Sequence, residues 1–151
     1  MKTLNINGKE YKLEYSFEAA EHKDTVQKMF KVLSGAYLVK ANNGNLADTM
    51  IDGVSEMVAD IPHIVKTAFY SGLLENHAVT EAEAYELMKA YMKENKVSYN
   101  GLFEDIKTCM EDDGFFALSG LLEMLQKMSE ETPKKAPKTP QDHKTKSTST
   151  K

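Results

Sequence analysis

The sequence predicts a mainly α-helical domain, a helical bundle, with a short N-terminal β-hairpin and a disordered C-terminal tail. Three observations support this fold class. Apolar and polar residues alternate around Asn7-Gly8, apolar residues recur at helical spacing over most of residues 17–128, and the composition changes abruptly at Glu130. At 151 residues, 41% of them hydrophobic, the chain fits one domain with a core. We therefore divide it into a folded domain, residues 1–129, and a tail, residues 130–151.

The hairpin is predicted for residues 3–15. Asn-Gly is the pair that best tolerates the two positive φ angles of a type I′ turn. Two strands alone are marginally stable in water, so their apolar face must pack on helices. That face combines residues from both strands: Leu4, Ile6, Tyr11, Leu13 and Tyr15.

Helical spacing predicts three helices before residue 75. The first follows Ser16 as N-cap and runs to about Lys40, where Asn42-Asn43-Gly44 breaks it; Asn45 caps the second. Pro62 is expected to end the second helix or to start the third. Their apolar stripes are expected to face the core, and the main members are Val26, Met29, Phe30, Leu33, Met50, Ile51, Val54, Met57, Val58, Ile61, Ile64, Val65, Phe69 and Leu73.

Three further helices are predicted for residues 80–128. Thr80-Glu81-Ala82-Glu83 is a capping box, in which the Thr80 hydroxyl and the Glu83 carboxylate satisfy each other's free backbone N–H groups. Ser98 is a candidate N-cap for the next helix, which ends before Gly114. The last helix is expected to run unbroken from Phe115 to Met128.

The tail combines three prolines with Lys, Thr, Ser and Gln, a composition that cannot bury enough apolar surface to offset the entropy of ordering. Its charge also differs from that of the domain. Residues 1–129 hold 13 lysines and 20 acidic residues, a net charge of −7, whereas residues 130–151 hold 6 lysines and 3 acidic residues, a net charge of +3. The two parts make up the overall −4.

This composition favours a protein partner. The chain has no arginine, the residue best suited to bidentate recognition of guanine and phosphate, and an acidic domain repels nucleic acid and anionic membranes. We find neither a signal-peptide h-region nor a membrane-spanning run. The single Cys109 suits a reducing compartment, so the cytoplasm is the expected location.

No pattern predicts a catalytic, metal or cofactor site, and we expect a protein that is not an enzyme. The four histidines are scattered without metal-ligand spacing. Glu111-Asp112-Asp113-Gly114 lacks the alternating acids and the later glutamate of an EF-hand, so a solvated helix end is expected there. No phosphate-binding glycine loop or nucleophile elbow is present, and Cys109 falls in an apolar stripe.

The order of these elements resembles the tail assembly chaperones of long-tailed phages and related prophages of Gram-positive bacteria. The resemblance covers about residues 1–129. It combines the hairpin around Asn7-Gly8, a helix start with Phe17, several acidic helices, the Thr80–Glu83 helix entry and a polar tail.

The resemblance implies a non-enzymatic helper that binds the tape measure protein, keeps that long apolar chain soluble and helps to recruit tail-tube subunits. Such a protein would work in the host cytoplasm and be absent from the mature virion; self-association is also expected. A holdase needs exposed apolar surface that engages helices of its partner. The best candidate is the last helix, which crowds apolar residues beyond one core stripe: Phe115, Phe116, Leu121, Leu122, Met124 and Leu125.

Many members of this family are made in two lengths by a −1 ribosomal frameshift. Pro133-Lys134-Lys135 is compatible with the codons CCA-AAA-AAG, which contain the slippery heptamer A-AAA-AAG. We therefore hypothesise a shift there, which would give a longer form of the same protein as a further partner. Two alternatives remain open: a structural tail component, which would need more β-structure, and a host-directed helical adaptor or regulatory protein.

Overall fold

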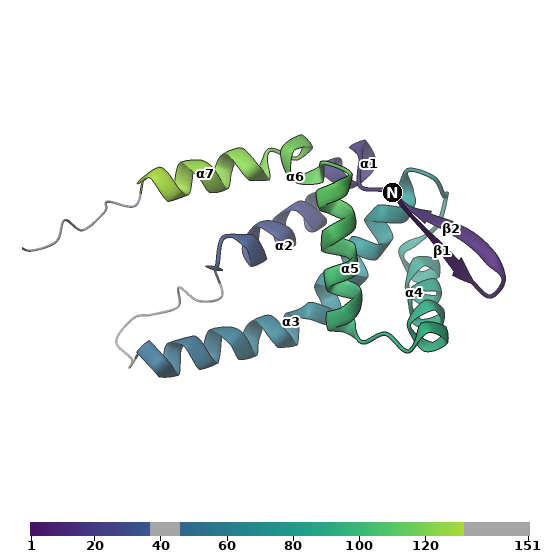
Figure 1. Ribbon diagram of the computed structural model, residues 1–151, viewed down its shortest axis with the longest axis horizontal. Coiled ribbons are helices and arrows are strands. Elements are labelled where there is room, and N and C mark those ends of the chain that lie inside the picture. Colours follow the sequence, from purple (N-terminus) through teal and green to yellow (C-terminus); the bar gives the residue numbers. More distant parts are fainter. Residues whose placement is uncertain (37–45, 132–151) are drawn as a thin grey trace, which may run out of the picture.

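The computed structural model describes residues 1–36 and 46–131. Strands β1 (Lys2–Ile6) and β2 (Lys9–Leu13) precede helices α1 (Phe17–Glu21), α2 (Lys23–Leu33), α3 (Leu46–Leu74), α4 (Glu81–Asn95), α5 (Tyr99–Asp112), α6 (Phe115–Leu118) and α7 (Leu121–Glu131). The predicted fold class, helices with an N-terminal hairpin, is confirmed (Figure 1). The tail is predicted to begin at Glu130, but Glu130 and Glu131 belong to α7. The predicted break at residues 42–44, the Asn45 cap and residues 132–151 of the tail lie outside the described residues.

The hairpin has the predicted turn. Asn7 and Gly8 both have positive φ angles, 52° and 75°, and Ile6 pairs with Lys9 directly beside them. Leu4 and Ile6 on β1 and Leu13 on β2 are buried. Their shared face therefore packs into the domain, with β1 against α4.

The second half of α3 is the centre of the core. Helices α1, α2, α4 and α5 and strand β2 all contact α3. Each large apolar side chain removed from water here contributes about 1.5–3 kcal/mol. The buried apolar residues of this half are Ile61, Ile64, Val65, Ala68, Phe69 and Leu73.

Tyr15 joins the end of the hairpin to α3 and to α6. Its side chain is fully buried, its hydroxyl donates to the carbonyl of Ala68 at 3.1 Å, and its ring packs edge-on against Phe115. Gly72 lies directly beneath the ring, because a methyl carbon added there would be 2.7 Å from Cζ of Tyr15. One residue earlier, the N–H of Glu14 donates to the carbonyl of Gly72 at 2.8 Å.

Asp113, which caps the end of α5, holds the same segment from the other side. Its carboxylate accepts the backbone N–H of Tyr15 at 2.9 Å and the ammonium group of Met1. Burial alone would raise the pKa of Asp113, but these two donors outweigh it and lower the pKa. Asp113 was expected to be part of a solvated helix end; it is instead a structural residue, with only 11% of its side chain exposed.

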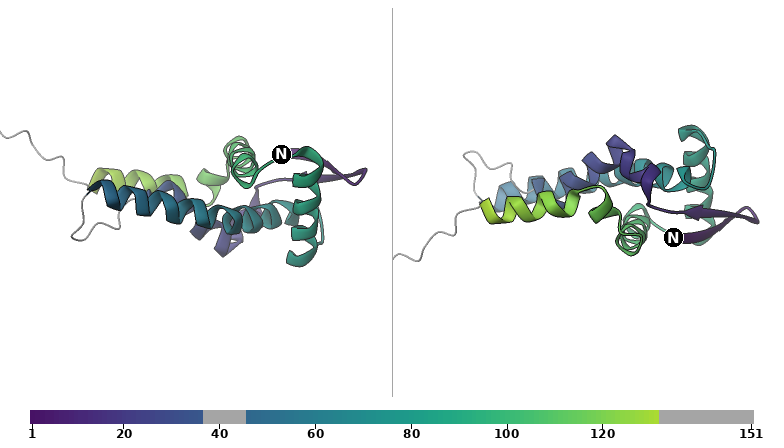
Figure 2. Two further views of the ribbon diagram at one scale, coloured as in Figure 1. Left: turned by 90° about the horizontal axis from the view of Figure 1, so that it is seen from below. Right: turned by 90° about the horizontal axis from the view of Figure 1, so that it is seen from above.

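The overall shape has a compact end and an extended end. The hairpin, α4 and α5 lie around the second half of α3, whereas α2, the first half of α3 and α7 extend away from the hairpin (Figures 1 and 2). Helix α2 contacts both α3 and α7. We call the first half of α3, Met50–Ala59, the α3 arm, and α6 with α7 the α7 arm.

The first predicted helix is two helices. His22 interrupts it with an extended backbone, ψ 96°, and its Nδ1 accepts the backbone N–H of Thr25 as the N-cap of α2. The interruption lets the buried Thr25 hydroxyl donate to Oγ of Ser71 at 2.9 Å. Helix α2 ends at Leu33 and not near Lys40, because Gly35 takes a left-handed conformation two residues later.

Pro62 does not break α3, contrary to expectation. Proline removes one backbone hydrogen bond and costs about 3 kcal/mol in a helix interior. Ile61, Ile64 and Val65 beside it are buried against the other helices. Their combined burial outweighs that cost, so the helix continues through the proline.

The last predicted helix is also divided, since Gly120 has a φ of 76° and separates α6 from α7. Two predicted caps are confirmed. The capping box between Thr80 and Glu83 is present, and the Ser98 side chain accepts the N–H of Gly101. Ser16 occupies the N-cap position of α1 as predicted, but its side chain makes no capping hydrogen bond.

The contact between Gly72 and Tyr15 predicts that Gly72→Ala destabilises the protein. Alanine favours a helix by about 1 kcal/mol over glycine, but forcing a methyl group into a packed ring costs about 1–3 kcal/mol. Because Tyr15 is fixed at both ends, we expect a net loss in the free energy of unfolding, measured in urea. Gly101→Ala is the control, since its nearest neighbour is one methyl group of half-buried Val97; a stabilised Gly72→Ala would contradict the close packing.

The lowered pKa of Asp113 predicts acid sensitivity. The carboxylate contributes stability above its unfolded pKa of about 3.9, and this stability is lost as the pH falls through the lower folded pKa. We expect Asp113→Asn to lose about 1–3 kcal/mol at neutral pH and to approach the unsubstituted protein at low pH. Urea unfolding at several pH values measures this. The control is Asp112→Asn, because Asp112 is an exposed neighbour. If Asp113→Asn lowered the free energy of unfolding equally at every pH, the negative charge of Asp113 would not be the source of the stability.

Candidate partner-binding surface

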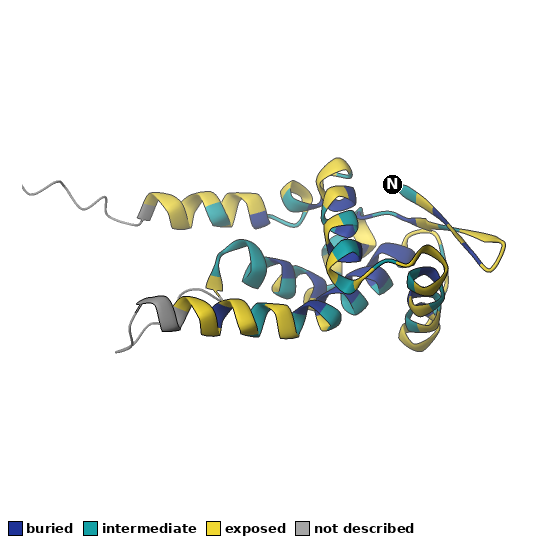
Figure 3. Ribbon diagram, turned by 60° about the horizontal axis from the view of Figure 1, so that its bottom comes forward, coloured by how far each residue is buried: buried dark blue, intermediate teal, exposed yellow. Residues whose placement is uncertain are grey.

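Exposed apolar side chains gather on the two arms. Ten large hydrophobic residues are exposed in the described residues, and only Met1 and Phe17 lie elsewhere. The arms are accordingly coloured mainly as exposed in Figure 3. Exposed apolar residues gathered in this way are typical of sites of protein interaction. The eight arm residues are Met50, Ile51, Val54, Val58, Leu118, Leu122, Met124 and Met128.

On the α3 arm these residues form one stripe. Met50, Val54 and Val58 recur every four residues and therefore share a face, with Ile51 beside them. Between 46% and 66% of each residue is exposed. A shallow hollow of about 410 Å³ lies over Met50, Ile51, Val54 and Ser55, so this face presents both apolar area and shape.

The α7 arm contains the residues chosen from the sequence, and the structure divides them. Leu122 and Met124 are 47% and 52% exposed, and Phe116 and Leu125 are half-buried. Phe115 and Leu121, however, are 0% and 4% exposed. These two belong to the core, where Phe115 packs against Tyr15, so we leave them out of the surface.

The α3 arm was missed, because its stripe was expected to face the core. A periodic stripe shows which residues share a face but not whether another element covers that face. The lengths that leave this stripe uncovered, 29 residues for α3 and 11 for α2, follow only from the structure. The methionines divide similarly: Met29, Met88 and Met110 are buried, whereas Met50, Met124 and Met128 are exposed.

The arms are acidic. Between Met50 and Ile61, α3 carries Asp52, Glu56 and Asp60 and no basic residue. Lys31 of α2 lies 3.6 Å from Glu56 and 3.0 Å from Asp60. On α7, residues 121–131 hold three glutamates and one lysine.

A groove lies where the α3 arm meets α2 and α5. It has a volume of about 330 Å³, and Asn100, Glu104 and Lys107 are its polar lining residues. Its apolar lining residues come from three helices: Val32, Leu33, Met57, Ile61 and Phe103. The exposed apolar surface of the α3 arm therefore continues toward the core.

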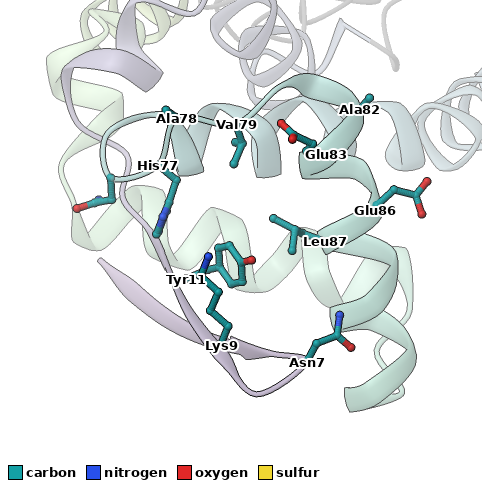
Figure 4. A pocket seen from close by; sticks show the side chains of 11 residues that line it. Asn7, Lys9, Tyr11, His77, Ala78, Val79, Ala82, Glu83, Glu86 and Leu87 are labelled. Atoms are coloured by element: carbon teal, nitrogen blue, oxygen red, sulfur yellow. The ribbon is translucent and has the colours of Figure 1, made fainter.

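A larger cavity, about 760 Å³, lies between the hairpin tip and α4, at the other end of the molecule (Figure 4). Tyr11, Val79 and Leu87 face into it. Its polar groups are engaged within the protein: Nε2 of His77 accepts the N–H of Lys12, and Glu83 serves the capping box. The pKa of His77 is lowered, first by burial and then by Lys9 and Lys12.

Cys109 behaves as a core residue, as predicted. Burial raises the pKa of its thiol to about 11, and nearby Asp113 adds to the shift. Across residues 1–36 and 46–131 we find no group of three or more His, Cys, Asp or Glu side chains placed to hold a metal ion. Over the same residues, no helix combines the length and apolar character needed to cross a membrane.

Comparison of the chain with protein-family models, with curated proteins and with solved structures gives no match.

The exposure of the α3 arm predicts that Ile51→Ser with Val58→Ser leaves stability nearly unchanged. Substitutions at exposed positions usually alter the free energy of unfolding by less than about 0.5 kcal/mol each. We also expect weaker fluorescence of the dye 8-anilinonaphthalene-1-sulfonate, which binds exposed apolar surface. Ile64→Ser is the contrasting core change and should cost at least about 3 kcal/mol. A comparable loss for the arm variant would show that this face is covered.

Proposed function

We propose that the chain is a tail assembly chaperone of a long-tailed phage or prophage, which binds the tape measure protein and assists assembly of the tail tube around it. The proposal combines the family resemblance of the sequence with one structural observation. Eight of the ten exposed large hydrophobic residues of the described chain lie on two arms that extend from the core. A helper for a long apolar partner needs such a surface.

The arms suit helical partners. An amphipathic helix binds through apolar residues at i, i+3, i+4 and i+7, and it pairs with a stripe of similar spacing. The stripe of the α3 arm has this spacing, and exposed methionines stand on both arms. Methionine side chains are flexible, so they adapt to apolar partners of varied sequence. These features support a holdase that accepts many segments of one long chain.

The acidic charge of the domain supports the same role, because a protein with exposed apolar residues must resist association with itself. In this proposal the protein acts in the host cytoplasm and leaves before the virion is mature. Recruitment of the tail-tube protein belongs to the same proposal, as does a longer form made by frameshifting at Pro133-Lys134-Lys135. These three residues lie outside the described residues. The codons of the gene test the frameshift hypothesis directly, because codons other than CCA-AAA-AAG would lack the slippery heptamer.

Co-expression with the long protein encoded by the neighbouring gene tests the proposed function. We expect the long protein to move from the insoluble to the soluble fraction and to co-purify with this chain. The variant Ile51→Ser with Val58→Ser should lose at least half of that effect, because it removes two of the four exposed apolar residues of the α3 arm while keeping the fold.

Phe17→Ser is the matched control, since Phe17 is 66% exposed but lies on α1, outside both arms. It should keep the solubilising effect. If the long protein remains equally insoluble with and without the chain, the chaperone proposal fails. Recovery of a host protein in its place would favour the adaptor alternative.

A further inference from the structure

The arms carry eight of the ten exposed large hydrophobic residues of the described chain. The charge of the arms indicates which kind of partner binds there. The α3 arm and its continuation to Ile61 carry three acidic residues and no basic one, and α7 has a net charge of −2 over residues 121–131. Lys31 lies near two of the acids, Glu56 and Asp60. Asp52 and Glu123 are exposed, and within residues 1–36 and 46–131 neither forms an ion pair with a lysine.

We propose that the partner segments bound by the arms are amphipathic helices with lysine or arginine residues beside the apolar stripe. This inference rests on the proposed function and adds the chemistry of the segment that the arms select. A second copy of this chain would bring a second set of acidic arms, so like charges oppose that occupant. A helix with basic flanks is attracted by the same charges.

Helix geometry determines how the charges act. With about 100° between successive residues, Asp52 lies about 100° from exposed Ile51 and about 160° from Val54 around α3. Glu123 lies about 100° from both exposed Leu122 and exposed Met124 around α7. The acids therefore lie beside the exposed apolar residues and not among them. They act through the field across about one helix diameter, about 10 Å.

The expected size of the effect follows from that distance. In water, two unit charges about 10 Å apart change an affinity by about a factor of two, and several pairs together give about tenfold. The Debye length is about 30 Å in 0.01 M salt and about 8 Å in 0.15 M salt. The preference for basic helices should therefore be large at low salt and small at physiological salt, while the apolar contribution remains.

The test uses the full chain and two fluorescent synthetic peptides of about 18 residues, which form a helix about 27 Å long. Both peptides have the same leucine stripe at i, i+3, i+4 and i+7. One has lysine at the flanking positions and the other has glutamate. By fluorescence anisotropy, we expect the lysine peptide to bind about tenfold more tightly in 0.01 M salt and the difference to shrink in 0.15 M salt. Equal binding, or no binding of either peptide, would overturn the inference.

Charge reversal places the effect on the arms. The variant Asp52→Lys with Glu123→Lys should weaken binding of the lysine peptide about fourfold at each arm in about 0.01 M salt, because each reversal replaces a roughly twofold attraction with a roughly twofold repulsion. It should strengthen binding of the glutamate peptide. The control is Glu10→Lys with Glu111→Lys, which changes the net charge equally at exposed sites on β2 and α5. If both variants weaken binding equally, the overall charge and not the arms selects the peptide, and the inference fails.

Sedimentation equilibrium tests the rival occupant. The family resemblance leads us to expect self-association, but the acidic arms oppose a second copy, so we expect the chain alone to be a monomer at the concentrations used for peptide binding. A dimer that Ile51→Ser with Val58→Ser dissociates would place a second copy on the arms and overturn the inference. The co-expression experiment remains a separate measure of the proposed function. If the long partner becomes soluble but the peptides show no preference for basic helices, the chaperone proposal stands and only the charge selectivity is overturned.

Discussion

The position of Tyr15 connects parts of the chain that the helices alone would leave separate. Its ring is enclosed by Gly72 of α3 and Phe115 of α6, its hydroxyl bonds to Ala68, and its N–H bonds to Asp113. Through this one residue the hairpin is fixed to α3, and the end of α5 is fixed to the hairpin. The hairpin could not remain folded by itself in water, so its stability depends on these contacts.

This arrangement explains why the apolar arms remain outside the core. The hairpin, α4 and α5 pack around the second half of α3. The short helix α2 also contacts α3, but it leaves the apolar side chains of the α3 arm exposed. Residues 50–58 of α3 and residues 122–128 of α7 therefore present apolar side chains that the described elements do not enclose. The same helix thus supplies the centre of the core at one end and an exposed surface at the other, without interruption at Pro62.

Local chemistry made part of this structure predictable from the sequence. The Asn7-Gly8 turn, the Thr80–Glu83 capping box and the Ser98 cap depend on neighbouring residues only, and all three are present. The passage of α3 through Pro62, the exposure of Val54 and the burial of Phe115 depend on distant residues. No periodic pattern contains that information, because a stripe is equally apolar whether or not another helix covers it.

The bond between Tyr15 and Asp113 spans 98 positions of the chain, and this separation has a consequence for folding. Most of the helices lie between the hairpin and the carboxylate that fixes its end. Closing so distant a contact costs chain entropy before it contributes any stability, which slows folding. The contact with Asp113 is therefore expected to form late in folding, and until α5 is in place the end of the hairpin is held by its bonds to Ala68 and Gly72 of α3.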